Sequence, residues 1–92
     1  MEIGSLIKVG LPGETPWAEV VSIVDAKSFI GRIDNKLFRE YSEIEKARFL
    51  SDNFGTVKSL PELHKYKKDD LVLFSWSDEE GRFLSKEKVK HQ

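Results

Sequence analysis

Residues 17–34 read WAEVVSIVDAKSFIGRID, which is the pattern of two β-strands joined by a short turn. Residues 17–24 are rich in β-branched side chains, residues 25–28 favour a turn, and residues 29–34 form the returning strand. Apolar side chains fall on both faces of the first strand, which predicts a strand covered on both sides or one that bends around a small barrel. Gly31 lies inside the second strand, where a glycine commonly marks a bulge, a sharp bend or the close approach of another backbone.

Further strands are predicted on both sides of this hairpin. Residues 5–11 form a first strand, and the loop that follows it, residues 12–16, contains Gly13 and two prolines. Residues 71–76 and 82–84 form a second hairpin around the turn SDEEG. Ahead of that hairpin, a short strand at 56–60 and a turn at 61–64 are expected.

A single helix is predicted between the two hairpins, over residues 43–54. Ser42 and Glu45 have the spacing of a capping box, in which each side chain accepts a hydrogen bond from the other residue's backbone amide. Gly55 follows, where a left-handed residue commonly ends a helix. The helical period also gives one apolar stripe, which we expect to pack against the sheet. Its members are Ile44, Ala47, Leu50 and Phe54.

Together these elements predict a single domain over residues 1–92, of the α+β class but mainly β. A small, strongly bent antiparallel sheet with one helix packed over an open face or end accounts for their order. An SH3-like barrel is the nearest common architecture, and an open roll is the alternative. The basic segment at residues 86–92 is expected to be a frayed tail.

Composition narrows the classes of function. The chain has 92 residues and no cysteine, so it can form neither disulfides nor thiolate metal sites. Its 15 Lys and Arg against 16 Asp and Glu argue against a protein whose main task is to grip nucleic-acid phosphates. The apolar runs are far too short to cross a membrane, and the first residues do not have the pattern of a signal peptide. We therefore expect a cytoplasmic protein that does not associate with membranes.

The most promising binding surface is a rim formed by the loop ETPW at residues 14–17 and by the strand end at residues 34–35. Trp17 offers an aromatic face for stacking, and Glu14 offers a carboxylate that accepts hydrogen bonds from a ligand. Asp34 and Asn35 are expected to converge on the same rim, because a barrel brings strand ends together. The structural alternative is that Trp17 plugs the barrel end, Glu14 binds loop amides, and Asp34 and Asn35 only form a turn.

A second candidate surface lies near the later strand. Tyr66 and Trp76, if both are exposed beside Lys65 and Lys68, form a stacking surface for single-stranded nucleic acid or a nucleotide. The structural alternative places both rings in the core or at the barrel end. Acidic residues at 69–70 and 78–80 oppose a phosphate-seeking face there.

No catalytic or metal site is predicted. His64 and His91 are the only histidines, and a zinc site needs further ligands. Ser59 lies near His64 in the sequence, but no nucleophile elbow surrounds it. The rim carboxylates lack the alternating spacing of a calcium loop. We therefore predict a protein that is not an enzyme and has no cofactor, and a hydrolase is the least favoured reading.

Three segments resemble a known family: Glu14 with residues 17–20, residues 31–35 (GRIDN) and residues 68–74 (KDDLVLF). The pattern is similar to that of the bacterial domain-of-unknown-function 2314 family, whose members carry an acid before a Trp-x-x-Val strand, a Gly-x-Leu-x-Asn strand and a Gly-Asp-x-Val strand. Residues 39–61 lie outside the resemblance. Leu37 stands where the family usually has proline, and Asp69 replaces its glycine. The resemblance implies a small β fold and no particular activity.

The favoured hypothesis is a non-catalytic interaction module that binds a protein or a small ligand through the rim. An accessory or inhibitor protein of a bacterium or a phage is one specific form of it. The alternative is an SH3-like protein that binds nucleic acid or sequesters a nucleotide through the second surface, and nucleic acid is the less favoured partner. Because an exposed edge strand in so small a sheet invites pairing, a homodimer is also expected.

Overall fold

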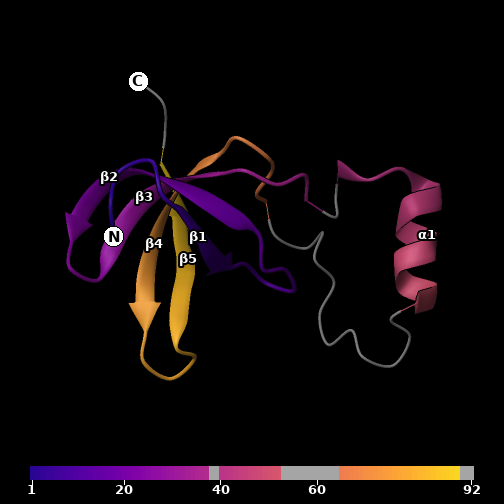
Figure 1. Ribbon diagram of the computed structural model, residues 1–92. Coiled ribbons are helices and arrows are strands. Elements are labelled where there is room, and N and C mark those ends of the chain that lie inside the picture. The colour runs from indigo at the N-terminus through magenta and orange to yellow at the C-terminus, as the bar shows by residue number, and fades with distance from the viewer. Residues whose placement is uncertain (38–39, 53–64, 90–92) are drawn as a thin grey trace.

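The computed structural model describes residues 1–37, 40–52 and 65–89. These residues form a mainly β domain with one short helix, and Figure 1 shows the helix to one side of the strands. The elements are β1 (Leu6–Gly10), β2 (Trp17–Asp25), β3 (Ser28–Ile33), α1 (Glu43–Asp52), β4 (Leu71–Ser77) and β5 (Arg82–Lys88). The predicted class, α+β but mainly β, is confirmed.

The five strands form a closed barrel, so the barrel and not the open roll is the correct alternative. Each strand pairs with the next in antiparallel fashion, and the barrel closes where β1 runs parallel to β5. Gly10 makes this closure tight, because a Cβ atom there would lie 2.6 Å from Cδ2 of Leu84. A larger residue at position 10 would therefore require the Leu84 and Arg82 side chains to shift.

The barrel interior is filled by side chains that alternate along the strands. The Phe29 ring stacks on Phe74 with ring centroids 5.3 Å apart and meets Phe83 edge-on at 5.0 Å. Around this aromatic group lie the other buried apolar residues, Val9, Leu11, Ala18, Val20, Ile33, Leu37 and Val72. A Cβ atom at Gly31 would lie 2.7 Å from the Phe29 ring, so the close neighbour at this glycine is a side chain and not the backbone that was predicted.

The long strand β2 changes its role along its length. Ala18 and Val20 in its first half point into the barrel and are buried. Irregularities in the register follow at Val20/Ser22 and Ile23/Asp25, and the apolar side chains of this second half are exposed. The reading that β2 bends around a barrel is therefore correct, and the reading that it is covered on both faces is wrong.

The capping box is confirmed at the start of α1. The Ser42 amide donates to Oε1 of Glu45 at 3.3 Å, and the Glu45 amide donates to Oγ of Ser42 at 3.3 Å. The described helix ends at Asp52, so the predicted end at Phe54 and Gly55 lies outside the described residues, as do the strand and turn expected at 56–64. Within the described ranges, no helix has the length and apolar character needed to cross a membrane.

The first two residues of the predicted apolar stripe, Ile44 and Ala47, are not packed against the sheet, while the Leu50 side chain and Phe54 lie outside what the structure describes. Ile44 is 74% exposed and Ala47 is also exposed. The reason is the position of α1, which lies beside the closed barrel and covers no open face of it (Figure 1). The aromatic residue that α1 brings toward the barrel is Phe49, which is half-buried.

The final strand is longer than expected. β5 continues to Lys88, where Val72 pairs with Lys88 and Leu73 pairs with Glu87. The expectation of a frayed tail from residue 86 is therefore wrong for residues 86–88, because the edge of β4 supplies their hydrogen-bond partners. The Val89 amide extends the ladder by donating to the Leu71 carbonyl at 2.8 Å, and residues 90–92 lie outside the described residues.

Asp69 adopts a conformation that favours glycine. Its φ is +73°, and its amide donates to the Ile33 carbonyl at 2.8 Å in the turn that leads into β4. The next residue, Asp70, closes this turn by accepting a hydrogen bond from the Lys67 amide at 3.0 Å.

We expect Asp69→Gly to stabilise the domain by up to about 1 kcal/mol, because glycine removes the steric strain of a left-handed residue. Urea unfolding followed by tryptophan fluorescence measures the change. Asp69→Ala is the matched control, since it removes the carboxylate but keeps the Cβ atom, and it should not stabilise. Equal stabilities of the two variants would contradict a backbone origin.

Candidate functional site

The two corners of the predicted rim lie together in the structure. The Trp17 amide donates to Oδ1 of Asn35 at 2.5 Å, and the Asp34 amide donates to the Trp17 carbonyl at 2.9 Å. The start of β2 and the end of β3 are thus joined by backbone and side chain together. The Asn35 side chain forms this bond, so its amide has a structural role at the rim.

The loop before β2 is a tight turn. The Leu11 amide donates to the Glu14 carbonyl at 2.8 Å, and the Glu14 amide donates back to Leu11 at 3.1 Å. Gly13 permits this turn with a φ of +78°. The Val9 amide then donates to the Pro16 carbonyl at 2.9 Å, so both ends of the loop are fixed to the barrel. The loop therefore presents Glu14 and Trp17 from a well-defined backbone.

A pocket with a volume of about 440 Å³ lies between this loop, the segment after β3 and α1. We call it the rim pocket. It is lined by Lys8, Gly13, Glu14, Thr15, Pro16, Trp17, Asn35, Lys36, Leu37, Tyr41 and Phe49. Pro16 and Leu37 are buried, and Leu37 belongs to the barrel core, so the pocket is built directly on the folded barrel.

Two lysines of the rim pocket lie over aromatic rings. The Nζ atom of Lys8 is 5.4 Å from the centroid of the Trp17 ring, and that of Lys36 is 5.5 Å from the centroid of the Tyr41 ring. Distances of this size allow the ammonium group to be attracted by the face of the ring. Lys8 and Trp17 are paired across β1 and β2, which explains why residues distant in sequence meet here.

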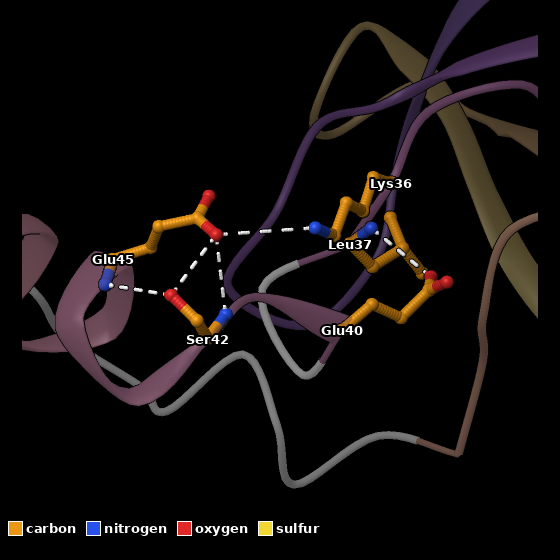
Figure 2. Close-up of polar contacts among 5 residues, drawn as sticks. All are labelled: Lys36, Leu37, Glu40, Ser42 and Glu45. Atoms are coloured by element: carbon orange, nitrogen blue, oxygen red, sulfur yellow. Dashed lines mark hydrogen bonds and ion pairs between the residues drawn. The ribbon is translucent and has the colours of Figure 1, made fainter.

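The segment between β3 and α1 is fixed by two glutamates, as Figure 2 shows for Glu40 and Glu45. Oε1 of Glu40 accepts from the Leu37 amide at 3.1 Å and from the Lys68 amide at 2.7 Å. Glu40 therefore links this segment to the residues just before β4 and also closes a hydrogen bond within the segment. As its neighbour in the chain, Tyr41 is placed at the pocket by the same anchor.

Glu45 joins the helix start to the pocket wall. Its Oε1 atom lies 3.9 Å from Nζ of Lys36 (Figure 2). Hydrogen bonds from the Ser42 amide and then the Ser42 hydroxyl hold the pKa of Glu45 below its usual value, and Lys36 and Arg48 add a smaller attraction. Glu45 thus stays ionised beside Lys36 at neutral pH.

The structure places the four rim residues in two roles. Glu14, Trp17 and Asn35 line the rim pocket, and Trp17 is 43% exposed. Asp34 is exposed and takes part through its backbone bond to Trp17, but its side chain is not among the lining groups. Sequence reasoning did not identify the other polar and aromatic walls, namely Lys8, Lys36, Tyr41 and Phe49.

The second candidate surface is divided between the two ends of β4. Tyr66 precedes the strand and packs against the barrel core. Trp76 lies near its other end, where its amide donates to the Lys27 carbonyl in the turn between β2 and β3. Trp76 is 40% exposed, and its Nε1 donates to Oδ1 of Asp78 at 2.9 Å. Lys65 and Lys68 are exposed beside Tyr66, at the end away from Trp76.

No group of three or more His, Asp or Glu side chains with the geometry of a metal site occurs among residues 1–37, 40–52 and 65–89. Ser59, His64 and His91 lie outside these ranges. The chain matches no protein-family model, no curated protein and no solved structure. The resemblance to the 2314 family therefore stays a prediction, and arguments about function rest on the rim pocket itself.

Proposed function

We propose that this protein is a non-catalytic interaction module whose ligand or partner enters the rim pocket. The observation that carries the proposal is the partly exposed Trp17, which lines a pocket together with Leu37 of the barrel core. A large aromatic side chain left partly exposed beside a concave surface is typical of recognition sites. The fixed backbone of the loop and of Asn35 supports this reading, because a preformed site loses little entropy on binding.

The polar groups of the rim pocket support binding over catalysis. The pocket combines lysines, one glutamate and one amide around aromatic walls. Lys8 and Lys36 each lie over a ring, and the Asn35 amide oxygen accepts from backbone. These groups suit charge recognition and orientation of a ligand.

The combined substitution Glu14→Ala and Trp17→Ala is expected to abolish retention of the partner while the domain stays folded. Truncating these side chains leaves the backbone bond from Trp17 to Asn35 in place. Partner retention from a lysate of the source organism by the immobilised protein, quantified by mass spectrometry, measures the effect. Trp76→Ala is the matched control, because it removes a similarly exposed tryptophan that does not line the rim pocket.

Retention of the same partner by the folded double variant would contradict the proposal. An unfolded double variant, seen as collapsed dispersion of the amide NMR signals, would show that both side chains are structural and would equally remove the site. Loss of the partner in the Trp76 variant alone would place the binding surface at Trp76 instead of the rim pocket.

A further inference from the structure

The aromatic walls of the rim pocket come from three separate segments of the chain. Trp17 begins β2, and Phe49 belongs to α1. Tyr41 lies in the segment between β3 and α1, next to Glu40, whose side chain binds the Leu37 amide. None of these three rings belongs to the buried apolar cluster of the barrel. Aromatic side chains gathered at one concave site are suited to stack on a flat ring.

The charges of the same pocket favour an anion. Lys8 and Lys36 line it together with one carboxylate, Glu14. Among the residues that the structure describes, no carboxylate lies within ion-pair distance of Lys8, and the pair formed by Lys36 with Glu45 is long at 3.9 Å. Both ammonium groups lie over rings that would otherwise attract a cationic ligand. A cation is therefore disfavoured, and an anionic group finds two donors beside aromatic surface.

The size of the pocket favours a small molecule over a polymer. A volume of about 440 Å³ is in the range of small-ligand sites. A strand of nucleic acid would need a basic stripe that continues beyond the pocket. Instead, the chain has a net charge of −1, and Glu80 of the acidic turn at residues 78–80 lines a second pocket with Gly13 of the rim loop, so a basic stripe does not continue on that side. The two lysines thus form a local anion site.

Resting on the function proposed above, we propose that the rim pocket binds a small anion that carries a flat ring, of the chemical class of a nucleoside monophosphate. The ring packs against the aromatic walls, with Trp17 at the mouth. The phosphate accepts hydrogen bonds from the ammonium groups of Lys8 and Lys36. The pairing of each lysine with a ring places the charge next to the stacking surface, as such a ligand requires.

The test uses the indole N–H signals of the full chain in ¹⁵N NMR, because the protein contains only two tryptophans. Adenosine, guanosine and uridine monophosphates are titrated separately, with adenosine and inorganic phosphate as the ring-only and charge-only probes. We expect at least one nucleotide to shift the Trp17 signal and leave that of Trp76 in place. Adenosine and phosphate should each bind more weakly by roughly tenfold or more, since each makes only part of the contacts.

Lysine variants test the charge directly. Lys8→Met and Lys36→Met should each weaken nucleotide binding by roughly tenfold, while Lys27→Met in the distant β2–β3 turn should not change it. Absence of a Trp17 shift with every nucleotide would overturn the inference, as would equal binding of adenosine or phosphate alone. If partner retention still depends on Glu14 and Trp17 in that case, the proposed function survives and only the ligand class is wrong.

Discussion

Replacing Gly31 with valine is expected to destabilise the barrel by at least about 3 kcal/mol, a large part of the stability of so small a domain. Even the first added carbon has no room. It would lie 2.7 Å from the Phe29 ring and 3.2 Å from both Ala18 Cβ and the Phe74 ring. Valine adds two further methyl groups on a side chain with few rotamers, so the strands around Gly31 have to separate.

Urea unfolding followed by tryptophan fluorescence measures this change. Ser22→Val is the matched control, because it adds the same branched side chain at an exposed position on the neighbouring strand β2. Its effect should stay within about 0.5 kcal/mol, as for most surface substitutions. A Gly31→Val protein as stable as the control would mean that the strand is not packed as closely as the structure shows.

Gly31 also illustrates which features could be predicted from the sequence. A glycine within a β-branched run, a polar turn after residue 24 and the Ser42–Glu45 spacing are local signals, and each determines backbone geometry over a few residues. All three appear in the structure. The meeting of Trp17 with Asn35 was likewise predictable, because a hairpin places the start of one strand beside the end of the next.

The helix shows where local pattern fails. Ile44 and Ala47 have the spacing of a buried stripe, but a stripe is buried only if a complementary face lies opposite it. The closed barrel leaves no such face, because β1 and β5 join its two edges. Barrel closure depends on the pairing of the first strand with the last, and the sequence of neither strand alone predicts that pairing.

The walls of the rim pocket were missed for a related reason. Lys8 meets Trp17 only through the register of β1 and β2, and Tyr41 is positioned by Glu40, which binds an amide of residue 68. Such contacts join residues that belong to no recognisable local sequence motif. A lysine that alternates outward on a strand gives no signal of its own. Pairing register would have been the signal to use, since it places Lys8 opposite Trp17.

The central ring of the core should give a second large effect. Phe29→Ala is expected to cost about 3–5 kcal/mol, because it removes buried ring surface and leaves a cavity. Phe29 also contacts both Phe74 and Phe83 through their rings, which adds to the loss. Urea unfolding measures the effect, and Phe29→Leu, which preserves more of the buried volume, should lose clearly less.

Phe29 and Gly31 must also be coupled, because the Phe29 ring is the nearest obstacle to a Cβ atom at position 31. Gly31→Ala alone should therefore destabilise by about 1–3 kcal/mol, but by less in a Phe29→Leu background, where the obstructing ring atom is gone. A double-mutant cycle by urea unfolding measures the difference. If the free-energy losses of the two substitutions simply add, a contact other than the Phe29 ring explains the glycine. If the loss is smaller in the leucine background, contact with the Phe29 ring is the reason that β3 contains glycine at position 31.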